Sequence, residues 1–237
     1  MAATIRANAR PRLNVNQMTK PTIRLAVLLL LTATMISSSG CLAFVANMVR
    51  VIKGTDAPAE FDDLKEKKVA VIASTPAGYN ADASAIIMSS HVHTLLATNV
   101  RKIQVVNQEE VNRIISDLPA SEQGMALIGS RLGADYVVSV EIANLKLRDG
   151  QTLYKGSSTT TLTVYKVSEG NNAVYRKVFP DFNFPVMGMP ITDIDEATFQ
   201  RFYLAEVAQR VARTFYAYDP SVDVAKEASV ASISSFR

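Results

Sequence analysis

The sequence predicts an α/β fold in which a mixed sheet of about five strands has helices packed on it. Three observations predict this fold. First, short apolar runs typical of buried strands alternate with segments whose apolar residues recur at helical spacing. Second, strand-like segments follow one another later in the chain, with turn signals between them. Third, in the last long segment the apolar residues again recur at helical spacing. The expected order is β-α-β-α-α-β-β-β-α.

The first elements alternate strand with helix. Residues 69–73 form a short β-branched run that follows charged residues and precedes Pro76, which predicts a buried strand. Residues 81–99 carry apolar side chains at helical spacing, so we expect a helix there. The segment "KIQVV" (102–106) then predicts a second strand.

The segment "NQEEVNRIISDLP" is the clearest helix of the chain. Asn107 can cap its first turn, and Glu110 stands three residues later, as in a capping box. Pro119 ends the helix. Its apolar residues form one stripe: Val111, Ile114, Ile115 and Leu118.

A third helix and a long strand meet at Gly133. The helix is expected over residues 121–132, and Gly133 follows it where a left-handed C-cap is needed. The strand "ADYVVSVEIANLKL" (134–147) comes next, and its alternation becomes looser after Ile142. On one side of this strand we expect Tyr136, Val138, Val140 and Ile142.

Two more strands and a final helix complete the domain. A turn at "RDGQ" leads to the strand "STTTLTVYKV", which "SEGNN" joins to the strand "AVYRKVF" in a hairpin. The last helix is expected to begin near Asp193 or Asp195, where an acidic residue suits the helix dipole. Its apolar residues recur every four positions: Phe199, Tyr203, Val207, Val211 and Phe215.

The N-terminal region is typical of a secretory signal. Residues 1–40 contain five basic residues and no acidic one, and residues 25–36 are an apolar run. Ser39 and Gly40 directly precede Cys41, which is the only cysteine of the chain. This junction resembles the lipobox of bacterial lipoproteins, although Ser38 stands where leucine is usual. We therefore predict that the chain is cleaved before Cys41 and anchored in the membrane by lipid on that thiol.

An uncleaved signal anchor in the inner membrane is the alternative, because residues 25–49 contain no charge over twenty-five residues. The first seventeen residues are long for a basic lead, and a true start at Met18 would give the signal ordinary proportions.

The rest of the chain divides into three parts. We expect a lipid-anchored tether over 41–66, one domain over 67–218, and a polar, disordered tail over 219–237. Removing residues 1–40 leaves 20 basic and 22 acidic residues, so the net charge changes from +3 to −2. The basic character belongs to the leader, and we expect no binding of nucleic acid.

Several sequence segments of this domain resemble the CsgG-like family of bacterial envelope lipoproteins, over about residues 67–215. The resemblance rests on "KKVAVIAS", "VVNQEEVNRIISDL" and above all "LIGSRLGADYVVSVEI". It implies a mixed α/β domain, lipid-anchored in the envelope, that binds other envelope proteins and can form homo-oligomers. By family analogy, Leu42 after the lipidated cysteine favours the periplasmic face of the outer membrane.

The resemblance leaves several functions open. The family's pore-forming member secretes curli subunits through long inserted hairpins, whereas only a dozen residues separate "EIANLKL" from "TTTLTVYKV" here. A non-catalytic accessory factor for assembly, secretion or the cell wall is therefore the first interpretation. A component of an oligomeric secretion channel and an enzyme acting on envelope polymers are the alternatives.

The sequence contains no catalytic motif, and we expect no cofactor and no metal. His91 and His93 are two residues apart on an expected helix, so they point to different sides. Asp193 and Asp195 could hold a cation, but the start of the last helix explains them more simply. The loop at residues 74–76 follows a strand's carboxyl end, where α/β folds often bind ligands, although a plain turn is the default.

The segment "FPDFNFPVMGMP" (179–190) combines apolar residues with three prolines and one glycine. Proline and glycine argue against a regular element, so we expect a loop folded over the edge of the sheet or the end of the core. The alternative is an exposed loop that binds a partner. Its contact residues would be Phe182, Phe184, Met187 and Met189.

Overall fold

The computed structural model describes residues 56–119 and 122–221. These residues belong to the second of two compact units, Asp56–Arg237. The predicted signal peptide, the lipidation site at Cys41 and most of the predicted tail lie outside the described residues.

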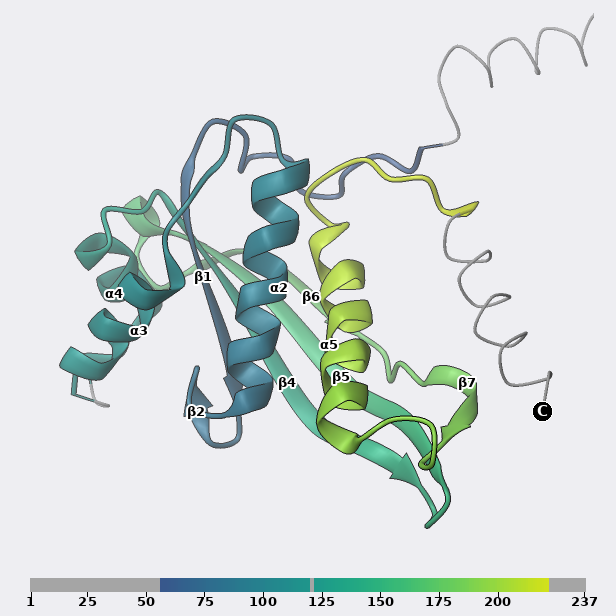
Figure 1. Cartoon of the computed structure of the whole chain (residues 1–237). Helices are drawn as coiled ribbons and strands as arrows, with labels where there is room; N and C mark the ends of the chain where they lie inside the picture. The colour runs from purple at the N-terminus through teal and green to yellow at the C-terminus, as the bar shows by residue number, and fades with distance from the viewer. Residues whose placement is uncertain (1–55, 120–121, 222–237) are drawn as a thin grey trace, which may run out of the picture. The chain divides into compact units, whose positions relative to one another are not determined.

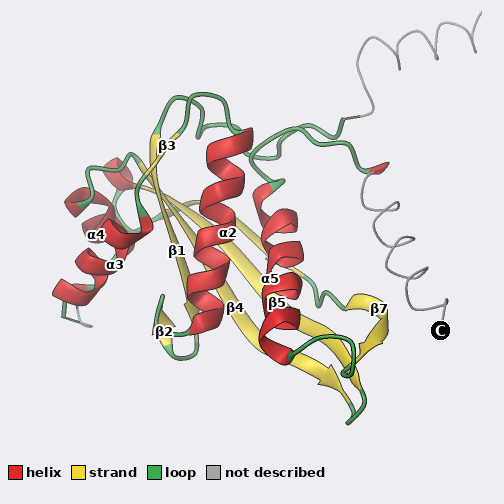
Figure 2. Ribbon diagram, viewed as in Figure 1, coloured by secondary structure: helices red, strands yellow, loops and turns green. Residues whose placement is uncertain are grey.

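A mixed seven-stranded sheet forms the centre of this unit (Figure 2). Its main path runs in the order β2-β1-β4-β5-β6, while β3 pairs with β1 and β7 pairs with β5. The pairs of β1 with β3 and with β4 are parallel, and the remaining pairs are antiparallel. The strands are β1 (Lys68–Thr75), β2 (Gly78–Tyr79), β3 (Gln104–Val105), β4 (Tyr136–Asp149), β5 (Leu153–Lys166), β6 (Ala173–Phe179) and β7 (Phe184–Pro190).

Within residues 56–119 and 122–221, four α-helices pack on the two faces of the sheet. The two long ones, α2 (Ala83–Asn99) and α5 (Glu196–Ala212), lie side by side on one face (Figure 1). The shorter helices α3 (Gln108–Asp117) and α4 (Met125–Arg131) cover part of the other face. The predicted mixed α/β fold is therefore confirmed, with β2 and β7 as additional strands.

The apolar run of β1 is buried because both faces of this strand are covered. Val69, Val71 and Ala73 belong to the core beneath α2 and α5. Ala70 and Ile72 belong to the smaller core beneath α3 and α4. A strand covered on both sides needs no polar face, which explains the continuous run.

Strand β4 follows the predicted alternation. The residues expected on one side all lie in the core beneath α2 and α5, whereas Val137 lies in the opposite core. The looser pattern after Ile142 also has a structural cause. The register with β5 shifts between Ala143 and Lys146, and Asn144 has a φ of 55°.

The helix caps in the structure match the predicted caps in part. The side chain of Asn107 caps α3 by accepting a hydrogen bond of 2.8 Å from the amide of Glu109. The capping box is not completed, because Glu110 is exposed and makes no return hydrogen bond to residue 107 within the described chain. Gly133 has the predicted left-handed conformation, with a φ of 59°, and it follows Leu132, the C-cap residue of α4.

Helix α4 begins later than predicted, at Met125 instead of residue 121. Gly124, its N-cap, is extended. The side-chain amide of Gln123 donates hydrogen bonds to the carbonyl oxygens of Ile115 and Leu118, at 3.1 and 3.0 Å. Gln123 thus completes the end of α3, which explains why the two helices are separate.

The domain begins before residue 67, so the predicted tether is too long at its C-terminal end. Leu64 is fully buried in the main core, and Phe61 packs against that core. Ala57 pairs with Tyr218 in an isolated β-bridge. Burial of these side chains explains the correction, because a tether would leave them in water.

Candidate functional site

Residues 184–190 form the edge strand β7, so the prediction that the segment 179–190 contains no regular element is wrong for this part. Strand β7 pairs with β5 on one side only, and its register slips between Tyr154 and Gly156. An edge strand can contain Pro185 and Pro190 because an outward-facing position needs no amide donor. The expectation that the segment folds over the sheet edge agrees with this pairing.

The four candidate residues of this segment have different environments. Phe184 is buried, with 3% of its surface exposed, and belongs to the main core. Phe182 is half-buried and stacks on Phe184 and on Tyr203, with ring centroids 5.7 and 6.2 Å apart. Met189 is also half-buried, whereas Met187 is 74% exposed. The aromatic members therefore hold the segment in place, and Met187 faces solvent.

Exposed apolar side chains gather along one edge of the sheet. Four large apolar side chains are exposed among the described residues, and three of them lie on β6 or β7. We call strands β6 and β7, with these three side chains, the β6–β7 edge. Val178 is 56% exposed, Val186 60% and Met187 74%, whereas the fourth residue, Ile86, lies on α2. No pattern in the sequence distinguishes Val178 or Val186 from other apolar residues.

A buried hydrogen-bond network fixes the segment that leads into β7. The hydroxyl of Tyr203 on α5 lies 2.8 Å from the hydroxyl of Ser158, and it also donates to the carbonyl oxygen of Phe182 at 2.8 Å. The guanidinium of Arg210 lies 4.3 Å from the centroid of the Phe182 ring. Helix α5 thus holds Phe182, in the segment between β6 and β7, in place.

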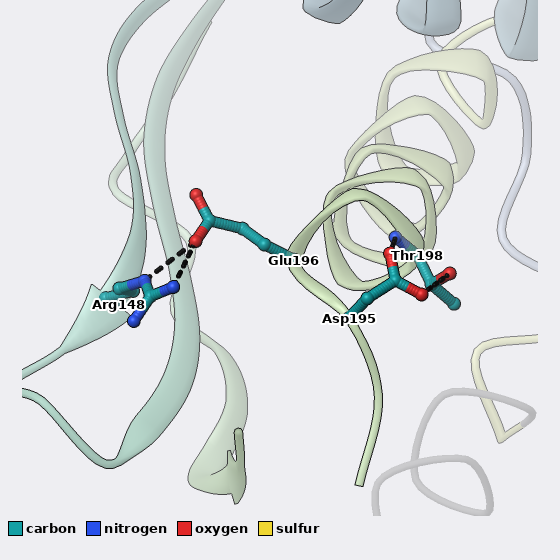
Figure 3. Close-up of polar contacts among 4 residues, drawn as sticks. All are labelled: Arg148, Asp195, Glu196 and Thr198. Carbon is teal, nitrogen blue, oxygen red and sulfur yellow. Dashed lines mark hydrogen bonds and ion pairs between the residues drawn. The ribbon is translucent and has the colours of Figure 1, made fainter. Parts of the chain in front are cut away.

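Helix α5 is also fixed at its first turn. Figure 3 shows that the guanidinium of Arg148 on β4 reaches the carboxylate of Glu196, with Nε 2.8 Å from Oε2. Asp195 is the N-cap, and its carboxylate accepts hydrogen bonds from the amide and the hydroxyl of Thr198 at 2.9 and 2.7 Å. The capping role predicted for this pair of aspartates therefore belongs to Asp195. Asp193 lies in the preceding turn.

The candidate metal ligands are not brought together. His91 and His93 lie on α2 on either side of buried Val92, and burial lowers the pKa of His93. Both carboxylate oxygens of Asp195 are used in capping. Residues 56–119 and 122–221 contain no cluster of three or more histidine, cysteine or acidic side chains placed to hold a metal ion.

The loop at residues 74–76 lines a cleft of about 450 Å³. Helices α3 and α4 cover only part of their face of the sheet, and the cleft lies on strands beyond Met125. Its wall contains one carboxylate, Glu141, and one guanidinium, Arg176. The other lining side chains are mainly hydroxyl-bearing: Ser74, Thr75, Tyr79, Ser139, Thr163 and Tyr165. Such a wall suits a polar ligand.

No helix within the described ranges combines the length and the hydropathy needed to cross a bilayer.

No protein-family model matches the sequence, and no curated protein matches it. Among solved structures, the PelC dodecamer from Paraburkholderia phytofirmans is 12% identical, with 68% of this chain and 94% of that chain covered and a TM-score of 0.41. The LpoB C-terminal domain from Salmonella enterica is 14% identical, with 58% and 91% covered and a TM-score of 0.35. Lipoprotein GNA1162 from Neisseria meningitidis is 9% identical, with 61% and 97% covered and a TM-score of 0.39. Likeness at this level carries no inference about function.

Proposed function

We propose that this chain is a non-catalytic, lipid-anchored protein of the bacterial cell envelope, and that its β6–β7 edge binds another envelope protein. The anchor and the compartment rest on the sequence, where Ser39 and Gly40 precede Cys41 after an apolar run. The resemblance to the CsgG-like family agrees with this location. It also agrees with a role as an accessory factor in assembly, in secretion or at the cell wall.

The concentration of exposed apolar side chains on one edge of the sheet carries the proposal. A single exposed apolar residue is normal on a protein surface. Here, three of the four such residues in the described chain lie on two strands that border the same strand, β5. Met187 adds a flexible side chain of the kind that adapts to a partner's surface. Covering these side chains would remove them from water, which favours association.

The backbone of this edge also favours binding. Strands β6 and β7 pair with β5 on one side, and no other described strand pairs with them. An edge with unpaired amides and carbonyls can accept a further strand.

A photo-reactive amino acid at Met187 tests the proposal in cells that carry the native lipidated chain. We expect a discrete cross-linked product with another envelope protein. The same amino acid at Ile86, which is exposed on α2, is the matched control and should give no such product. Substituting Val186→Asp in the Met187-labelled chain should abolish the product while leaving the circular dichroism unchanged.

The mass of the cross-linked product distinguishes between the possible partners. A product of twice the chain's mass would identify a second copy and would favour the oligomeric channel. Equal cross-linking from positions 86 and 187, or no loss with Val186→Asp, would overturn the assignment of the edge.

The polar cleft favours a second candidate function, an enzyme acting on envelope polymers. Its Glu141 is the one carboxylate in the lining, whereas hydrolysis of a glycosidic bond usually needs a pair of carboxyl groups. Glu141→Gln should abolish turnover of envelope polymer fragments if this candidate is right. It should leave cross-linking at position 187 unchanged in either case, so the two functions can be distinguished.

A further inference from the structure

The polar cleft lies on the face of the sheet that α3 and α4 leave partly uncovered. Ile72 on β1 and Val137 on β4 belong to the core beneath those helices. Ser74 and Ser139 stand two residues further along the same two strands, so their side chains point to the same face. The cleft therefore continues the sheet surface beyond the end of that apolar core.

The topology of the sheet also favours a ligand at this place. Strand β1 is parallel to β3 on one side and to β4 on the other. Helix α2, which follows β1, packs on one face of the sheet, whereas α3 and α4, which precede β4, pack on the other. In open α/β sheets, ligands bind at the carboxyl ends of strands where the connections change face in this way. Residues Ser74–Tyr79, which end β1 and begin its turn, line the cleft.

Two opposite charges stand on different strands of the cleft wall. The strand register places Glu141 of β4 opposite Thr161 of β5, and Arg176 of β6 opposite Thr163 of β5. Directly paired residues share a face of the sheet, so both charged side chains project from the face that carries the cleft. Neighbouring strands lie about 4.8 Å apart and each residue rises about 3.3 Å, so the two Cα atoms are about 12 Å apart. A small molecule can lie between the two charges.

Neither of these charges has a partner in the described part of the chain. The side chains of Glu141 and Arg176 take part in no ion pair and no hydrogen bond there. The charges at the other end of β4 differ in this respect, because Arg148 is paired with Glu196. Both charges of the cleft are therefore available to a ligand.

Hydroxyl groups connect the two charged positions. Thr163 lies between Ser139 and Arg176 in one row across the sheet, and Ser139 is only 9% exposed. Within the described residues, the hydroxyls of Ser139, Thr163 and Tyr165 make no hydrogen bond. The hydroxyl of Thr75 differs, because it donates to the carboxylate of Asp82 at 2.6 Å. A hydroxyl can donate to a carboxylate and accept from an ammonium group, so this row suits a ligand that carries either.

We propose that the polar cleft binds a zwitterion, either a free amino acid or a short peptide, with its carboxylate toward Arg176 and its ammonium group toward Glu141. A guanidinium matches a carboxylate with two parallel hydrogen bonds. A ligand with charge of one sign would be attracted by one of these residues and repelled by the other, and a neutral ligand would leave both unpaired. The volume of about 450 Å³ is typical of small-molecule sites, which range from about 300 to 1,000 Å³.

This proposal does not depend on the β6–β7 edge or on turnover of a polymer. Val178, Val186 and Met187 do not line the cleft. Binding of a zwitterion also requires no bond to be broken, so it can be measured whether or not the chain has an enzymatic activity.

Isothermal titration of the full-length lipidated chain in a non-ionic detergent at pH 7 tests the proposal. The probes are alanine and the peptide trialanine, and we expect saturable binding of at least one of them to one site. Blocking the ammonium group by acetylation, or the carboxylate as an amide, should each weaken binding by about tenfold or more, because a charged hydrogen bond is lost. Tighter binding of trialanine would identify a peptide, and tighter binding of alanine a free amino acid.

Two variants assign each charge of the ligand to a residue. Arg176→Gln should bind the probe no better than its amide, because the group that recognises the carboxylate is gone. Glu141→Gln should in the same way bind the probe no better than its acetylated form. Both side chains are exposed and have no partner in the described chain, so neither substitution should lower the unfolding midpoint.

Two further variants are the controls. Arg131→Gln removes an exposed charge of α4 outside the cleft lining and should bind as the wild type does. Val186→Asp, which is designed to disrupt the β6–β7 edge, should also bind normally, so failure of one proposal can be distinguished from failure of the other. Absence of saturable binding, binding that neither block weakens, or an unchanged preference in both cleft variants would overturn the assignment.

Discussion

The ring of Tyr203 lies directly against the backbone of Gly156, so that a β-carbon on residue 156 would be only 2.0 Å from Cδ2 of the ring. This contact brings α5 onto β5 at the level of the β6–β7 edge, because Gly156 also pairs with Phe184 of β7. A residue with a side chain at this position would separate the helix from the sheet.

Gly156→Ala should therefore destabilise the domain. The methyl group must displace a fully buried ring, and overpacking of this kind costs about 1–3 kcal/mol. Urea unfolding followed by circular dichroism measures the loss. Ser157→Ala, at the neighbouring position, is the control and should change the midpoint little. Equal midpoints for Gly156→Ala and the wild type would show that the helix can move away without cost.

Tyr203→Phe should destabilise the domain at neutral pH by about 1–2 kcal/mol, because Ser158 and the carbonyl of Phe182 lose their partner. Burial raises the pKa of Tyr203 to about 12, while an unfolded tyrosine titrates near 10. The wild type therefore keeps this stability below about pH 10 and loses it as the pH rises toward 12. The free energies of unfolding of the variant and the wild type should be measured from pH 7 to 11.5. The difference between them should become smaller above pH 10. A gap independent of pH would contradict this account.

Gly133→Val should lower stability by about 1 kcal/mol or more, because a β-branched residue is strained at a φ of 59°. Gly133→Asn is the informative control, since asparagine adopts left-handed conformations more readily. The midpoint of thermal unfolding should be highest with glycine at position 133, lower with asparagine and lowest with valine. An unchanged midpoint for the valine variant would mean that this end of α4 rearranges without strain.

Asp195→Ala should lower the unfolding midpoint by a few degrees, because the amide of Thr198 loses its acceptor at the start of α5. Asp195→Asn keeps an acceptor and should retain most of the stability. Hydrogen bonds from Thr198 hold the pKa of Asp195 below its usual range. The contribution of Asp195 is thus present above the unfolded pKa and is lost as the pH falls through the folded one. The alanine and wild-type midpoints should converge in acid, and a constant difference would contradict the assignment.

Cys41→Ala should abolish lipid attachment. The thiol is the only one in the chain, and the acyl chains that it would carry provide the membrane affinity. Cells labelled with a radioactive fatty acid should show label in the wild type and none in the variant. If the variant keeps the label and stays in the membrane fraction, the signal-anchor alternative replaces the lipoprotein.

Patterns that depend on neighbouring residues could be read from the sequence. The apolar run of β1, the stripe of α3 and the alternation of β4 all reflect burial on one or two faces of a single element. The left-handed turn at Gly133 also follows from local chemistry, because few other residues accept that conformation.

Features that depend on distant pairing could not be read in this way. Strand β7 contains prolines, which argue against a strand in the sequence. It forms because it pairs with the first residues of β5, and this pairing exists only in the folded chain. The burial of Leu64 likewise requires the finished core.

The bridge between Ala57 and Tyr218 brings the first and the last described residues of the chain together. Both ends of the described chain meet near the C-terminal end of α5, whereas β7 lies near the N-terminal end of that helix (Figure 1). The 17 residues of α5 span about 25 Å. The point where the chain enters the domain is thus about a helix length away from β7, whereas β6 reaches the C-terminal end of α5 through Lys177 and Phe179. A partner that covers the exposed side chains of both strands would therefore extend along most of the length of α5.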